Sequence, residues 1–130
     1  MESLKEFIKK HKANSEKAKD FVDYLYELMD KHGFDKNSDL YNKANISRQL
    51  WSSVISKKSE PSLNFTLKLV FTLHLNNHEC KYLLKKAGYT LSSNNEYGLI
   101  IRYCIENKIY DLLEVNKLLE SRGYSDSLII

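Results

Sequence analysis

The sequence predicts an all-α fold, and three of its features support this prediction. Apolar residues recur at intervals of three and four along most of the chain, which is the spacing of a helix face and not of a strand. Capping residues stand where these patterns begin, and glycines stand where several of them end. The chain has 130 residues with one proline and four glycines, and 42% of it is apolar, as expected for one globular domain with its own core.

The first part of the chain is expected to form a short helical arm and a longer helix. Ser3 and Glu6 have the spacing of a capping box, in which each side chain accepts a hydrogen bond from the other's backbone amide. Residues 1–14 are therefore expected to form the arm. The longer helix is expected to begin near Ser15 and to end at Gly33, because glycine readily adopts the left-handed conformation that ends many helices.

Residues 38–56 are expected to form two short helices that meet around residues 44–46. Ser47 is well placed to cap the second helix with its hydroxyl group. A polar connection at residues 57–61 follows.

Four more helices are expected after this connection, at residues 62–75, 77–87, 94–107 and 111–122. Gly88 and Gly123 are expected to end the second and the fourth of them. Two capping boxes are expected at the starts of the last two helices, Ser93 with Glu96 and Asp111 with Glu114. Residues 125–130 are expected to be a loose or docking tail.

Residues 37–56 have the spacing of a helix-turn-helix. Their apolar or small residues stand where two short helices must press together at a steep angle over a third helix, and these residues are Leu40, Ala44, Ile46, Trp51 and Val54. Trp51 is therefore interpreted as a core residue. The other side chains of the second helix are polar and lie on its opposite face; they are Ser47, Arg48, Gln49, Ser52, Ser53 and Ser56.

The polar face of the second helix suits the major groove of DNA. Arg48 and Gln49 each present two hydrogen-bonding groups in one plane, which match the edges of guanine and adenine. The small side chains of Ser52 and Ser53 allow a helix to lie deep in the groove. The predicted phosphate contacts are Lys43, Ser56, Lys57 and Lys58.

Positive charge is concentrated in the same part of the chain. The whole chain has a net charge of +3, whereas residues 36–68 hold six lysine and arginine residues against two acidic residues and so carry +4 by themselves. Such a concentration is what an anionic partner requires. Double-stranded DNA is therefore the predicted partner.

A longer run of residues resembles a known family. Ile46, Ser47 and Arg48 at the turn, Pro61, Ser62 and Leu63 before the next helix, and then Leu67, Lys68, Leu69 and Leu73 follow one another without a gap. In these residues the sequence resembles the lambda-repressor-like family of helix-turn-helix regulators, of the Cro or xenobiotic-response-element type. The chain departs from the family pattern at Tyr41, Asn45, Ile55 and Lys57, where the family commonly has Ala, Gly, Glu and Gly.

The resemblance covers residues 15–88 and implies a five-helix DNA-binding domain of a transcriptional regulator, most often a dimeric repressor. It implies base contacts from the positions of Ser47, Arg48, Gln49, Ser52 and Ser53. The chain would then consist of the arm at residues 1–14, this domain at 15–88 and a helical extension at 89–130. The apolar residues of the extension either pack back on the domain or form a homodimer interface or a docking site for a partner protein.

Other classes of protein are not favoured by the sequence. No Gly-rich phosphate loop, paired catalytic carboxylates or nucleophile signature is present, so neither an enzyme nor a bound cofactor is expected. His74, His78 and Cys80 are not expected to bind a metal. Residues 75–77 are interpreted as a helix break, so His74 and His78 would not lie on one face of a helix. Without a long apolar segment or a signal peptide, the protein is expected to be cytoplasmic, with no membrane contact and with Cys80 and Cys104 as reduced core thiols.

One alternative function belongs to a different class. A protein-interaction module, such as an antitoxin-like protein or a phage-encoded inhibitor, could keep a helix-turn-helix scaffold and bind another protein. The bulky Tyr41, the modest net charge of +3 and the apolar extension favour this alternative. The charge excess of residues 36–68 favours DNA, because protein docking does not require it.

Overall fold

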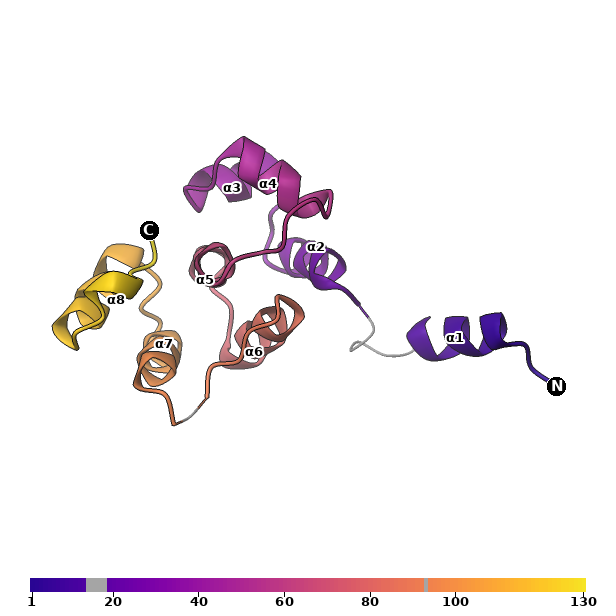
Figure 1. Cartoon of the computed structure of the whole chain (residues 1–130). Coiled ribbons are helices and arrows are strands. Elements are labelled where there is room, and N and C mark those ends of the chain that lie inside the picture. Colours follow the sequence, from indigo (N-terminus) through magenta and orange to yellow (C-terminus); the bar gives the residue numbers. More distant parts are fainter. Residues whose placement is uncertain (14–18, 93) are drawn as a thin grey trace.

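The computed structural model describes residues 1–13, 19–92 and 94–130 (Figure 1). These residues form eight α-helices and one short 3-10 helix, and they contain no strand. The elements are α1 (Leu4–Ala13), α2 (Phe21–Lys31), α3 (Asn37–Lys43), α4 (Arg48–Ile55), α5 (Leu63–Thr72), α6 (Asn77–Lys86), α7 (Glu96–Glu106), α8 (Leu112–Ser121) and η2 (Ser125–Ser127). The all-α prediction is confirmed. No helix among these residues is long and apolar enough to cross a membrane.

Helix α5 is the centre of the molecule. Figure 1 shows it end-on, with α2, α3, α4 and α6 around it and α7 and α8 on one side. Every residue from Phe65 to Phe71 is buried, so this helix is covered on all its faces. Its apolar core is continuous with that of the surrounding helices.

The start of α2 differs from the prediction. The helix begins at Phe21, where the Asp20 carboxylate accepts a hydrogen bond from the backbone N–H of Asp23 at 2.9 Å. Asp20 therefore supplies the cap of α2, and Ser15, near which the helix was expected to begin, lies outside the described residues. Gly33 follows the helix with φ of +80°, as predicted for its end.

Helices α3 and α4 are joined by a short turn and are held by local interactions. Asn45 adopts the left-handed conformation with φ of +55°, which asparagine tolerates better than most residues. The Ser47 hydroxyl accepts a hydrogen bond from the N–H of Leu50 at 3.1 Å, so the predicted cap is confirmed. The five residues predicted to press the two helices together are all buried: Leu40, Ala44, Ile46, Trp51 and Val54.

Tyr41 is accommodated at the edge of this contact. It is half-buried, and its ring centroid lies 5.8 Å from that of Trp51, which in turn lies 6.2 Å from the Phe65 ring of α5. These tilted ring contacts connect α3, α4 and α5. The bulk of Tyr41 is thus used in packing.

The break between α5 and α6 covers residues 73–76, so α5 ends three residues earlier than the predicted residue 75, whereas α6 begins at Asn77 as predicted. His74 has φ of +55°, and Asn76 and Glu79 form a complete capping box at the start of α6. Gly88 follows α6 with φ of +90°.

The helices of the extension pack against the rest of the chain. Ile101, Cys104 and Ile105 of α7 and Val115 and Leu119 of α8 belong to the common core. The Tyr110 hydroxyl donates a hydrogen bond to the carbonyl of Leu75 at 3.1 Å. Most of the apolar surface of the extension is therefore covered by the chain itself.

The caps of α7 and α8 agree with the prediction only in part. Asn95 caps α7 by accepting a hydrogen bond from Gly98 N–H at 3.4 Å, so Glu96 is the first helical residue and not the third; Ser93 lies outside the described residues. Asp111 caps α8 by accepting a hydrogen bond from Leu113 N–H at 3.1 Å. Gly123 follows α8 with φ of +90°, as predicted.

The tail beyond α8 docks on the helices. Ile129 is buried, and the Asn116 side chain both donates to its carbonyl and accepts from its N–H, each at 2.8 Å. The Asn64 side chain contacts the backbone of Ile130 in the same two ways, at 2.7 and 3.1 Å. Residues 125–130 were expected to be either a loose or a docking tail, and the structure shows a docked one.

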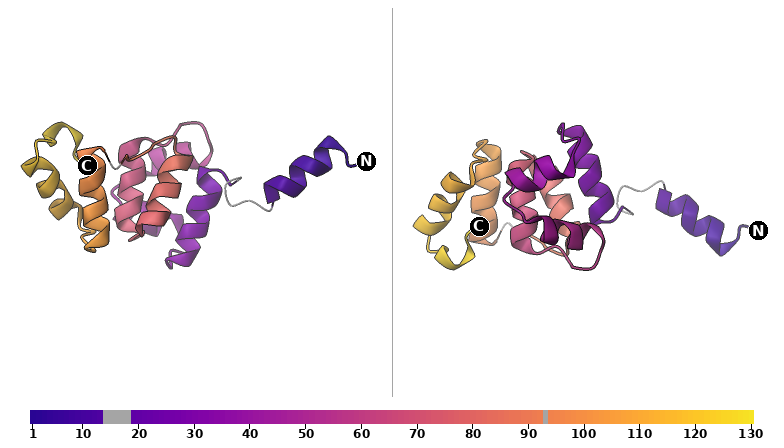
Figure 2. Two further views of the ribbon diagram at one scale, coloured as in Figure 1. Left: turned by 90° about the horizontal axis from the view of Figure 1, so that it is seen from below. Right: turned by 90° about the horizontal axis from the view of Figure 1, so that it is seen from above.

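Helix α1 lies apart from the other helices, at the opposite end of the molecule from α8 (Figures 1 and 2). The Ser3 hydroxyl caps it by accepting a hydrogen bond from Glu6 N–H at 3.2 Å. Its apolar side chains Leu4, Phe7 and Ile8 are exposed.

Candidate nucleic-acid interface

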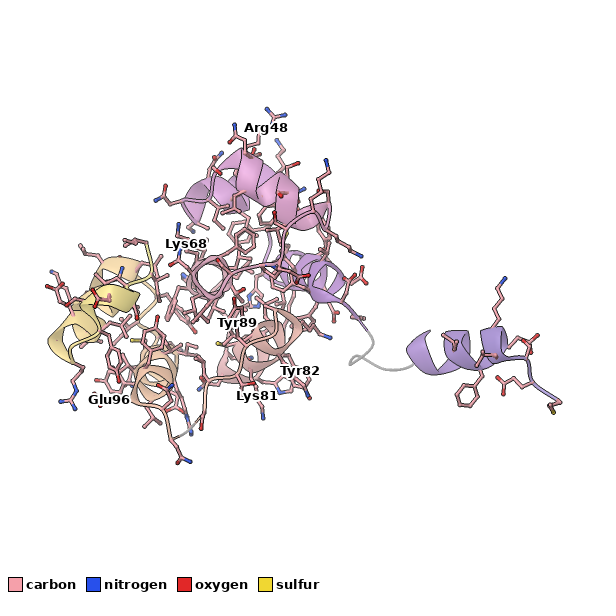
Figure 3. The ribbon with its side chains drawn as sticks, in the orientation of Figure 1. Arg48, Lys68, Lys81, Tyr82, Tyr89 and Glu96 are labelled. Atoms are coloured by element: carbon pink, nitrogen blue, oxygen red, sulfur yellow. The ribbon has the colours of Figure 1, made fainter. Side chains whose placement is uncertain are left out.

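Helix α4 presents a polar surface away from the body of the molecule. Arg48, Gln49 and Ser52 are exposed, and Figure 3 shows Arg48 extending outward from the top of the fold. On the opposite side of the helix, Trp51 and Val54 anchor α4 in the core. The structure therefore brings three of the five predicted base-contacting side chains to one accessible surface.

The other two predicted base-contacting residues have structural tasks. The hydroxyl of Ser47 is engaged in capping α4. Ser53 is half-buried, and its hydroxyl forms a hydrogen bond with that of Ser59, while its carbonyl accepts from Lys58 N–H at 2.9 Å. Ser53 therefore shapes the turn that follows α4, because its polar groups face that turn.

Leu50 is a surface residue that sequence reasoning missed. Its side chain is 44% exposed on a flank of α4. The sequence did contain a signal for its exposure, because Leu50 is apolar but does not belong to the set of residues that presses the two helices together. Its methyl groups can make apolar contacts with a partner.

The predicted phosphate-contacting residues differ in how free they are. Lys58 and Ser56 are exposed after the end of α4, and Lys43 is exposed at the end of α3 with its Nζ 5.8 Å from the centroid of the Phe34 ring. Lys57 forms an ion pair with Asp20. The hydrogen bond from Lys57 holds the pKa of Asp20 below its ordinary value. The Asp20 carboxylate is therefore charged at neutral pH and offsets the charge of Lys57.

Lys68 is not part of the surface charge. Its side chain is buried, and Nζ donates a hydrogen bond to the carbonyl of Asn45 at 2.9 Å, from below the turn between α3 and α4. Burial lowers the pKa of Lys68. Not all six cations of residues 36–68 are therefore available to an anionic partner, contrary to the charge count. The charge of Lys68 is buried, and that of Lys57 is paired with Asp20. The exposed remainder is Lys36, Lys43, Arg48 and Lys58.

A hollow of about 590 Å³ opens between the start of α3 and the exposed side of α4. Two cations and several amide and hydroxyl groups line it, namely Lys36, Asn37, Ser38, Arg48, Ser52 and Ser56, together with Tyr41, Trp51 and Ile55. The indole Nε1 of Trp51 is buried and has no hydrogen-bond partner among the described residues. This lining suits an anionic group with several acceptor oxygens, such as a phosphate.

The three residues considered as metal ligands, His74, His78 and Cys80, are in ring contacts or buried. The His74 ring stacks on Tyr110 with 4.4 Å between centroids, and the His78 ring lies 4.5 Å from that of Tyr82. Burial raises the pKa of the Cys80 thiol to about 12, so it is protonated at neutral pH. Within residues 1–13, 19–92 and 94–130, no three His, Cys, Asp or Glu side chains are grouped so that they could hold a metal ion.

A comparison with protein-family models, curated proteins and solved structures found no match to this chain. The functional assignment therefore rests on the residues of α3 and α4 and on their geometry.

Proposed function

We propose that the protein is a transcriptional regulator, most simply a repressor, that binds double-stranded DNA with α3 and α4 as its helix-turn-helix. The observation that carries this proposal is the division of α4 into two sides. Trp51 and Val54 fix the helix in the core, whereas Arg48, Gln49 and Ser52 are exposed together. A helix of this kind can enter the major groove without disturbing the core.

The order of the residues along α4 fits this role. Arg48 and Gln49 are the first two residues of the helix, and the N-terminal part of a recognition helix makes most of its base contacts. Ser52 lies one turn further on and is small enough to let the helix approach the bases. Lys36 lines the same hollow as Arg48 and Ser52, and Lys43 and Lys58 are exposed at the end of α3 and after the end of α4. These lysines would contact phosphates, which position the protein on the duplex.

The helix is also held in a fixed orientation, which limits the conformational entropy lost on binding. Lys68 holds the carbonyl of Asn45 in the turn, and Ser47 caps the helix. The tilted ring contacts of Trp51 with Tyr41 and Phe65 connect α4 to its neighbours. A rigid helix-turn-helix is the expected form of a sequence-specific reader.

We further propose that the protein acts as a homodimer in the cytoplasm, where two copies of α4 would contact a palindromic site. Exposed apolar side chains of the extension could take part in such a dimer. These side chains are Tyr103 of α7 and Leu113 of α8.

A second candidate function is supported by the surface of α4. Because Lys57 is paired and Lys68 is buried, this surface is less positive than the sequence suggested, and Leu50 adds an exposed apolar group to it. These features favour a module that binds another protein, antitoxin-like or inhibitory in kind.

The test is selection from a pool of random duplex DNA by the full chain at two salt concentrations, with sequencing of the bound fraction. A DNA-binding regulator is expected to enrich one palindromic motif. Arg48→Ala should then lose discrimination by about 1 to 3 kcal/mol, because a bidentate base contact is worth that much. Lys58→Ala should weaken all sequences alike and make the salt dependence less steep by about one phosphate contact.

Matched controls come from the same surface and from a distant one. Lys57→Ala should remove no direct phosphate contact, unlike Lys58→Ala, because the Lys57 ammonium is held by Asp20. Lys117→Ala, on the exposed side of α8, should have no effect. No enrichment, together with little affinity at low salt, would contradict DNA binding and favour the protein-binding alternative.

A further inference from the structure

A groove of about 800 Å³ lies between α6 and α7, and nothing in the proposed DNA contact uses it. Figure 3 shows Lys81, on its rim, on the opposite side of the molecule from Arg48. The volume of the groove is within the range of about 300 to 1,000 Å³ that is typical of small-molecule sites. A ligand in this groove would leave the α4 surface free.

The groove has an apolar wall among its lining residues. Leu84 of α6 and Ile101 and Ile105 of α7 are buried beneath it, and Leu91 and Leu99 lie at its side. Leu99 is 44% exposed, so the apolar lining continues to the surface. An alkyl chain or an aromatic ring would bury this surface from water.

Two further parts of the chain line the groove. Residues 89–92 pack closely against α7 at Gly98, which has no side chain; a Cβ there would be only 3.1 Å from the Leu91 Cβ and from the Ser92 carbonyl oxygen. Glu106 also lines the groove, and its Oε1 accepts hydrogen bonds from Asn77 at 3.2 Å and from Arg102 at 2.8 Å.

The charge at the rim selects the kind of ligand. Lys81 and Lys85 lie one turn apart on α6, both are exposed, and neither has an ion pair or a hydrogen bond within the described part of the chain. The acidic residue of the lining, Glu106, is already engaged by Arg102 and Asn77. The groove therefore has two unpaired positive charges beside an apolar wall.

We propose that this groove binds a small amphipathic carboxylate. The apolar part of the molecule would lie against Leu84, Leu99 and Ile105, and its carboxylate would pair with Lys81 and Lys85. Because the groove joins α6 to α7, a bound ligand also stabilises the contact between the extension and the central helices. The site does not depend on DNA binding.

The proposal is tested by titrating the isotope-labelled full chain with octanoate and following backbone amide signals by NMR. Saturable shifts are expected for residues of the groove between positions 77 and 106. Octylammonium, which has the same chain length and the opposite charge, should bind at least tenfold more weakly. Octanol, which has the same chain and no charge, serves as the neutral probe.

Variants separate the two parts of the site. The double substitution Lys81→Gln with Lys85→Gln should weaken octanoate at least tenfold and leave octanol unchanged, because only the carboxylate uses these charges. The matched control is Lys5→Gln with Lys117→Gln, two exposed lysines outside the groove, and it should leave octanoate binding unchanged. Leu99→Ser should weaken octanoate and octanol alike, since it removes part of the apolar wall without emptying the core.

Three results would overturn the proposal: no saturable shift, shifts confined to residues outside the groove such as the exposed apolar side of α1, or equal losses for the groove variant and its control. Circular dichroism of each variant confirms that it is folded. Because no DNA is present, failure here is distinct from failure of the proposed regulator function.

Discussion

Glu79 is a buried carboxylate that ties two helices together, and its removal should measure what that connection contributes. It is 4% exposed and stands in the first turn of α6. One oxygen accepts a hydrogen bond from Asn76 N–H at 3.1 Å, and the other accepts from Lys31 Nζ at 2.9 Å and lies 3.1 Å from His32 Nε2. The end of α2 and the start of α6 therefore meet at this side chain.

Substitution of Glu79 by Gln keeps an oxygen for the cap but removes the charge. Hydrogen bonds to a charged group are worth about 1.5 to 3 kcal/mol against about 1 kcal/mol for neutral ones. Because the Lys31 side chain is 61% exposed, its contribution is reduced by solvent. We expect Glu79→Gln to lower the free energy of unfolding by about 2 kcal/mol, which corresponds to a fall in Tm of about 8 °C in a domain of this size.

The assay is urea unfolding, followed by circular dichroism and by Trp51 fluorescence, with Glu27→Gln as the matched control. Glu27 pairs with Lys19 at 2.6 Å, but both side chains are more than 40% exposed. An exposed pair contributes less than about 1 kcal/mol, so the control should remain close to the wild type. Equal losses for the two variants would refute the reasoning.

The dependence on pH gives a second check. Burial raises the pKa of Glu79, but hydrogen bonds from Lys31, Asn76 and His32 outweigh burial, so the pKa lies below its ordinary value of 4.5. A carboxyl whose pKa is lowered by folding stabilises the protein above its unfolded pKa and loses that effect as the pH falls through its folded pKa. The difference between wild type and Glu79→Gln should therefore shrink below about pH 4.5. A difference that stays constant down to pH 3 would contradict this account.

Two further predictions concern the turn before α4 and its cap. Lys68→Met should change stability by less than about 1 kcal/mol, because removing the cost of burying the charge offsets the lost hydrogen bond to Asn45 and methionine retains the packing of the stem. It should leave the salt dependence of DNA binding unchanged, unlike Lys58→Ala. A less steep salt dependence in Lys68→Met would show that its charge reaches the partner. Ser47→Ala should cost about 1 kcal/mol in urea unfolding through loss of the cap, whereas Ser47→Asp should keep that stability and weaken DNA binding through repulsion of phosphates. If Ser47→Ala had the same free energy of unfolding as the wild type, the cap would contribute little to α4.

Much of the fold follows from local rules in the sequence. Leu40 and Val54 were recognisable as core residues because helical spacing alone places them on the inner sides of two short helices. Ser47 was recognisable as a cap and Gly33 as a helix end, because these roles depend on a few neighbouring residues. The exposed set of Arg48, Gln49 and Ser52 followed from the same spacing.

The parts that could not be predicted depend on residues far apart in the chain. The pairing of Lys57 with Asp20 joins positions 37 residues apart, and that of Lys31 with Glu79 joins positions 48 apart. Lys68 stands in a helix that is buried on every side, and no local pattern distinguishes its lysine from a surface one. Charge counted along the sequence therefore differs from charge on the surface.

The aromatic contacts described above also provide intrinsic spectroscopic reporters for two parts of the molecule. The single tryptophan, Trp51, is buried where α3, α4 and α5 meet, so its emission follows the packing of the helix-turn-helix region. The stacked rings of His74 and Tyr110 join the end of α5 to the segment before α8, and ring currents should shift the proton signals of the imidazole while that contact is intact. Unlabelled protein can thus show whether the central helices and the extension unfold in one transition or in two.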